Sequence, residues 1–140
     1  MTNDRLLYQV NSFPSILAMF YLVFNTVQTI FTLNTVDVSA AGIRVMEIIL
    51  LNIILSFLVF IISSEIKRYS MRWSWTGLGA GVFQCLRVLF IPTADFKAAM
   101  FIAVPLVLAG LILIFASIWS LIECRRHRLA KEEMPCHTSA

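Results

Sequence analysis

The chain has 140 residues, of which 59% are hydrophobic and only 14% are charged. Soluble domains carry nearer ~25% charged residues, so this composition excludes an ordinary soluble domain. The formal net charge of +3 does not indicate nucleic-acid binding, because the basic residues flank apolar segments. At such positions Lys and Arg set the topology of a membrane protein.

Four long and nearly uncharged segments fill most of the chain: residues 13–36, 45–66, 73–92 and 98–122. Each is long enough, at ~1.5 Å of rise per residue, to cross a hydrocarbon core of ~30 Å. The sequence therefore predicts an all-α, polytopic membrane protein with four transmembrane helices in an up-down bundle. We expect residues 1–140 to form this single domain, with 123–140 as a basic tail.

The first span has a polar face. Ser12 suits a helix N-cap and Pro14 suits the first turn, so the helix should begin there. Four polar residues follow at helical spacing on one face: Asn25, Gln28, Thr29 and Thr32. Lipid cannot hydrogen-bond amide groups, so this face should turn toward the bundle interior.

A short loop over residues 37–44 should separate the first span from the second. In the second span, Asn52, Ser56 and Ser63 share one face. Glu47 lies in the first turn of this span, about 140° around the helix from Asn52 at 100° per residue. Glu47 should therefore not share the face of Asn52.

The third span is the least apolar of the four. Gly77 and Gly81 form a small-xxx-small pair, which allows another helix to approach closely. Gln84 continues this face and Arg87 follows three residues later. Pro92 should end the helix, because proline interrupts the backbone hydrogen bonds.

The fourth span contains no charged residue. Ala103, Gly110 and Ser117 recur every seven residues as a stripe suited to helix packing. Pro105 should kink this helix or mark a local break.

The distribution of basic residues predicts the orientation. They gather in the second loop and after the fourth span: Lys67, Arg68, Arg72, Arg125, Arg126 and Arg128. The other two loops are nearly neutral. The positive-inside rule then places the second loop and both termini in the cytoplasm, and we expect the plasma membrane as the location. The tail arginines should also contact anionic lipid.

We expect one intramembrane polar cluster in the outer half of the bundle: Asn25, Gln28, Glu47, Asn52, Gln84 and Arg87. Counting from the outer ends of the spans places Arg87 roughly 7 Å deep, Glu47 roughly 3 Å and the amides of Gln28, Asn52 and Gln84 roughly 11–12 Å. Intramembrane charges often mark ligand or ion pathways. The structural alternative is favoured: Arg87 snorkels to the headgroups or pairs with Glu47 or Asp37.

No catalytic constellation is visible, and we expect a protein that is not an enzyme and holds no cofactor or metal. The two histidines, His127 and His137, lie in the tail, and no glycine-rich phosphate loop occurs. The expected partners are the lipid bilayer and either another membrane protein or a second copy. We interpret the chain as an accessory or assembly subunit of a larger membrane complex such as a transporter. The alternative is a small oligomeric transporter or channel that uses the outer polar site.

Overall fold

The computed structural model describes residues 11–35, 38–91 and 95–133. Its elements are α2 (Ser12–Thr35), α3 (Val38–Ile66), α4 (Met71–Leu86), the 3-10 turn η1 (Arg87–Phe90) and α5 (Phe96–Glu132). The predicted all-α class is confirmed for these residues. Three helices, α2, α3 and α5, are long and apolar enough to cross a membrane, whereas α4 is shorter.

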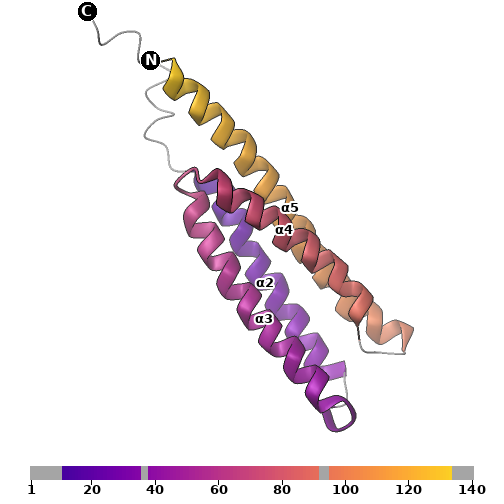
Figure 1. Ribbon diagram of the computed structural model, residues 1–140. Coiled ribbons are helices and arrows are strands. Elements are labelled where there is room, and N and C mark those ends of the chain that lie inside the picture. The colour runs from indigo at the N-terminus through magenta and orange to yellow at the C-terminus, as the bar shows by residue number, and fades with distance from the viewer. Residues whose placement is uncertain (1–10, 36–37, 92–94, 134–140) are drawn as a thin grey trace, which may run out of the picture.

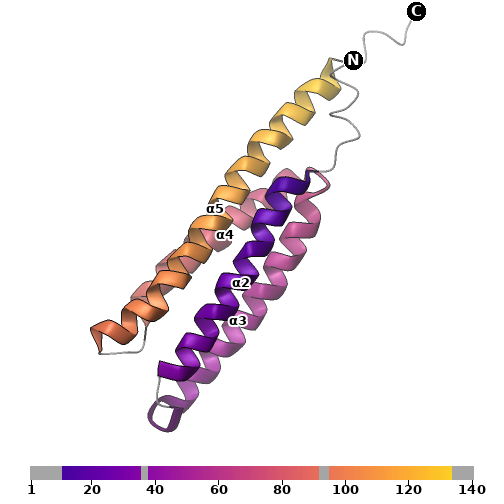
Figure 2. The same ribbon diagram turned by 180° about the vertical axis from the view of Figure 1, so that it is seen from behind.

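Consecutive helices run antiparallel and form two hairpins, α2/α3 and α4/α5 (Figures 1 and 2). Each helix packs on two others, in the ring α2–α3–α4–α5–α2. We call the end with the α3–α4 turn the tail end, because α5 extends beyond the bundle there. At the opposite end the two hairpins spread apart (Figure 1). This divergence determines where the candidate site lies.

The connection between α2 and α3 is shorter than predicted. The expected loop over residues 37–44 is wrong for residues 38–44, which belong to α3. This segment contains no proline, and its alanines favour helix. Gly42 is tolerated within it, because a single glycine costs a helix only ~1 kcal/mol. Asp37 lies outside the described residues.

The third and fourth spans also differ in detail from the prediction. The α-helical part of the third span ends at Leu86 and continues as η1, so Arg87 lies at the junction of the two helix types. Pro92, the expected end, lies outside the described residues. The sequence predicts that Pro105 either kinks the fourth span or marks a local break. Helix α5 contains Pro105 and remains one helix, so the local break does not occur.

The α3–α4 turn and α5 contact each other at the tail end. Tyr69 has a φ of 56°, a left-handed conformation that glycine usually provides at this position. Its ring stacks on that of His127 in α5, with ring centroids 4.3 Å apart. With 37 residues, α5 is about 55 Å long, which exceeds the ~30 Å thickness of a hydrocarbon core.

The interior is divided along the bundle axis. An apolar core occupies the half nearer the tail end, with Tyr21, Val59, Ile62 and Leu113 fully buried. The buried amides of the bundle lie beyond this core, toward the opposite end. A second and smaller apolar cluster, Val45 and Ile102, follows them there. The polar residues thus form a layer between two apolar regions.

Candidate functional site

A continuous set of hydrogen bonds joins three helices in this polar layer. It contains five of the six residues predicted as a cluster: Asn25, Gln28, Asn52, Gln84 and Arg87. All five are at least nine-tenths buried. Because amides are costly to leave unpaired in lipid, their mutual pairing accounts for their burial here.

Asn25 is the junction of the polar layer. Its amide nitrogen donates to the Ser56 hydroxyl at 2.9 Å and to the backbone carbonyl of Asn52 at 3.3 Å, both on α3. Its carbonyl oxygen accepts from the Gln84 amide of α4 at 3.2 Å. One side chain of α2 therefore links this helix to both α3 and α4.

Asn52 makes the second link between α2 and α3. Its amide nitrogen donates to Gln28 Oε1 at 3.0 Å and to the Thr29 hydroxyl at 2.8 Å. The Gln28 amide in turn donates to the Thr32 hydroxyl at 3.0 Å. The side-chain oxygen of Asn52, Oδ1, is buried without a hydrogen-bond partner among the described residues.

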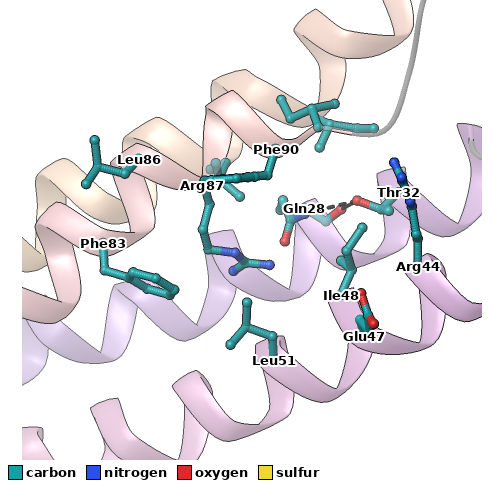
Figure 3. Close-up of a pocket in the computed structure, with 13 residues that line it drawn as sticks. Gln28, Thr32, Arg44, Glu47, Ile48, Leu51, Phe83, Leu86, Arg87 and Phe90 are labelled. Carbon is teal, nitrogen blue, oxygen red and sulfur yellow. Dashed lines mark hydrogen bonds between the residues drawn. The ribbon is translucent and has the colours of Figure 1, made fainter.

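Arg87 closes the set on the α4 side. Its side chain leaves the α4–η1 junction and points between α4 and α3, toward Leu51 and Gln28 (Figure 3). Only 8% of the residue is exposed. Nη1 donates to Gln84 Oε1 at 2.9 Å. Arg87 therefore points into the bundle.

The guanidinium borders a cavity of about 560 Å³, which all four helices line. Cavities of this size are typical of small-molecule sites. The polar lining residues are Gln28, Thr32, Arg44, Glu47 and Arg87, and eight apolar residues make up the rest. The cavity lies where the hairpins diverge, at the end opposite the tail.

Glu47 does not join the hydrogen-bonded layer. It lines the cavity on α3 but is exposed, and within the described part of the chain it makes no ion pair with Arg87. The proposed pairing of these two residues is therefore wrong in this structure. The position of Glu47 outside the polar layer agrees with the helical angle of about 140° that separates it from Asn52. The alternative pairing with Asp37 lies outside the described residues.

Three of the four predicted packing residues lie where α4 meets α5. A Cβ built on Gly81 would lie 3.0 Å from the carbonyl oxygen of Gly110, and one on Gly77 would meet the Ser117 hydroxyl. Ala103 is half-buried near the start of α5. The glycine faces are thus used within the chain, and they are not available to a partner helix.

The predicted lipid- and topology-related arginines all lie at the tail end and are exposed: Arg68, Arg72, Arg125, Arg126 and Arg128. Arg68 is 3.8 Å from Glu65, and Arg126 is 3.8 Å from Glu123. Arg128 approaches the Met71 sulfur. The two ion pairs are local and largely solvent-exposed, so they contribute little to stability.

Sequence reasoning missed most of the cavity lining. Arg44, Ile48 and Leu51 follow one another at spacings of four and three, which places them on one face of α3. That spacing was the available signal. Phe83 and Ile102 gave none, because apolar residues occur on every face of a membrane helix. Two hydroxyl pairs at the tail end were also missed, Ser15–Ser63 and Ser74–Ser120.

The described residues contain no group of three or more His, Cys, Asp or Glu side chains placed to hold a metal ion. His127 stacks on Tyr69 at the tail end of α5, whereas the polar layer lies toward the opposite end of the bundle. Comparisons of the chain with family models, with curated proteins and with solved structures find no match.

Proposed function

We propose that the chain is a non-catalytic integral membrane protein that serves as an accessory or assembly subunit of a larger membrane complex, such as a transporter. The observation that carries this proposal is the polar layer. Its amides and hydroxyls hydrogen-bond one another across α2, α3 and α4. Hydrogen bonds of this kind hold transmembrane helices together.

A single chain is poorly suited to conduct ions, and this favours the accessory role over conduction. The polar layer ends against the apolar core, where Val59, Ile62 and Leu113 are fully buried. An ion would lose its hydration there and gain no replacement ligand. Conduction would therefore need a route between several chains.

The second candidate function is a small oligomeric transporter or channel. The observation that favours it is the cavity beside Arg87, which all four helices line at one end of the bundle. A buried cation beside a cavity resembles the selectivity elements of anion pathways.

We further propose that the tail end faces the cytoplasm of a cell whose plasma membrane holds the protein. The exposed Lys67, Arg68 and Arg72 at this end support that orientation. The test is labelling of intact cells with a membrane-impermeant amine reagent. We expect single-lysine variants that retain Lys97 to label and those that retain Lys67 to remain unlabelled until the cells are opened. The reverse pattern would invert the orientation.

Purification in a mild detergent distinguishes the two candidate functions. We expect a larger membrane protein to co-purify in fixed stoichiometry, and loss of that protein to lower the abundance of this chain. A homo-oligomer without a partner, whose reconstituted flux falls in an Arg87→Gln variant, would instead support the transporter function. A matched Arg72→Gln variant controls for loss of one charge at an exposed site.

A further inference from the structure

The cavity at the diverging end of the hairpins combines one buried cation with an apolar wall. Its volume is about 560 Å³, and its apolar lining includes Phe83, Leu86, Phe90 and Leu106 from α4, η1 and α5. The side chain of Arg87 projects from the α4–η1 junction toward Gln28, Ile48 and Leu51 (Figure 3). The shape therefore suits a ligand with a small charged head and an apolar body.

Arg87 has hydrogen-bonding capacity that the protein does not use. A guanidinium carries five N–H donors. In the part of the chain that the structure describes, that of Arg87 donates one side-chain hydrogen bond, to Gln84. A buried arginine is costly unless its charge is compensated. The remaining donors border the cavity, so an anion bound there would supply the missing partner.

The charge of the lining fits a single negative charge. The cavity is lined by Arg44, Arg87 and Glu47. Glu47 forms no ion pair within 4.0 Å of either arginine among the described residues. The sum is one net positive charge. A dianion would leave uncompensated negative charge next to Glu47, which disfavours it.

We propose that this cavity binds an amphiphile that carries a single carboxylate, with the carboxylate on Arg87 and the apolar body against Phe83, Leu86 and Phe90. A planar guanidinium binds a planar carboxylate through two parallel N–H···O bonds. A methyl ester carries no negative charge and cannot form this charge-assisted pair. An amphiphile reaches the cavity from the surrounding lipid. This site goes beyond the accessory role and does not depend on it.

The test measures binding of cis-parinaric acid, a fluorescent polyene carboxylic acid, to the purified full chain in nanodiscs of zwitterionic lipid. The uncharged methyl ester of the same acid is the matched probe. We expect the acid to bind at least about tenfold more tightly than the ester, because a charge-assisted hydrogen bond is lost with the ester. Equal binding of the two probes would overturn the proposal.

Two variants locate the site. Arg87→Gln should weaken acid binding by about ten- to hundredfold and leave ester binding within about twofold. Ile48→Trp places a larger side chain in the cavity and should weaken both probes. The exposed Arg72→Gln is the control and should change neither. Unchanged acid binding in a folded Arg87→Gln variant would refute the assignment of Arg87.

Folding of each variant is checked by far-ultraviolet circular dichroism and gel filtration. If Arg87→Gln does not fold, Arg87→Lys replaces it: lysine keeps the charge but lacks the planar fork, so acid binding should still fall. A third arm uses nanodiscs that contain phosphatidylglycerol. If this lipid binds in an Arg87-dependent manner and parinaric acid does not bind, the ligand of the cavity is a phosphodiester, and the proposal of a carboxylate ligand is overturned.

Discussion

The contact between α4 and α5 allows a matched test with two glycines two residues apart. Gly79 is exposed on α4, and a Cβ built there meets nothing within 4 Å. Gly81 is buried, and its Cβ would lie 2.7 Å from Ile114 Cγ1 and 3.0 Å from both the Gly110 carbonyl oxygen and the Ile114 backbone nitrogen. Backbone atoms cannot rotate away, so α4 and α5 would have to separate.

The two substitutions, Gly79→Ala and Gly81→Ala, share one favourable effect. Each replaces a helical glycine by alanine, which stabilises a helix by about 1 kcal/mol. Only Gly81→Ala adds overpacking, which typically costs about 1–3 kcal/mol. The difference in unfolding free energy between the two variants therefore isolates the steric cost. We expect Gly79→Ala to be about 1 kcal/mol more stable than the parent and Gly81→Ala to be about 1–3 kcal/mol less stable than Gly79→Ala.

The assay is unfolding of the purified protein in mixed micelles by increasing sodium dodecyl sulfate, followed by circular dichroism. Gly42→Ala is a further control, because its Cβ also meets nothing within 4 Å. The reasoning is refuted if Gly81→Ala is as stable as Gly79→Ala. That result would mean that the helices do not approach as closely as the backbone distances indicate.

Three further predictions concern separate parts of the chain. Asn25→Leu should destabilise the bundle by about 1–2 kcal/mol in the same assay, because it removes a junction between helices and leaves buried amides unpaired; a change below about 0.3 kcal/mol would contradict this. Burial raises the pKa of the Cys124 thiol, so less of it is thiolate at pH 8. In a chain whose Cys85 and Cys136 are replaced by serine, maleimide should label Cys124 more slowly than a cysteine placed at the exposed position 125 (Arg125→Cys with Cys124→Ser). The labelling rate of Cys124 should still rise at a pH where that of the exposed thiol has levelled off. Tyr69→Ala should be about 1 kcal/mol less stable than Tyr69→Gly, because both lose the stacking on His127 but only glycine adopts the positive φ without strain.

The buried amides illustrate what periodicity predicts. The spacing of Asn25, Gln28 and Thr32 places them on one face of α2, and the polarity of that face predicts that it turns inward. All three are buried in the structure. Periodicity does not predict which amide pairs with which, because that depends on the rotation of each helix about its axis. The link from Asn25 to Gln84 spans 59 residues and depends on such rotations.

The errors have equally specific causes. The loop predicted over residues 37–44 rested on small residues and Gly42, but small residues without proline do not stop a helix. The pairing of Arg87 with Glu47 rested on similar depth alone. Depth ignores direction: Glu47 is exposed on α3, whereas Arg87 turns inward from the α4–η1 junction. A sequence gives the depth of a side chain more readily than its direction.

The division of the interior explains why a cavity occurs at one end only. In the tail half, a Cβ built on Gly77 of α4 would lie 3.2 Å from Ile62 Cγ2 of α3, and this close approach and the apolar core hold the hairpins together. In the other half, the hydrogen bond from Gln84 to Asn25 connects the hairpins through two side chains, and the short helix α4 gives way to η1. Side chains that bridge a gap hold helices farther apart than glycines in contact. The same residues that satisfy the polar groups therefore leave room beside Arg87, and ligand binding there should respond to changes in the amide layer more than to changes in the glycine contact.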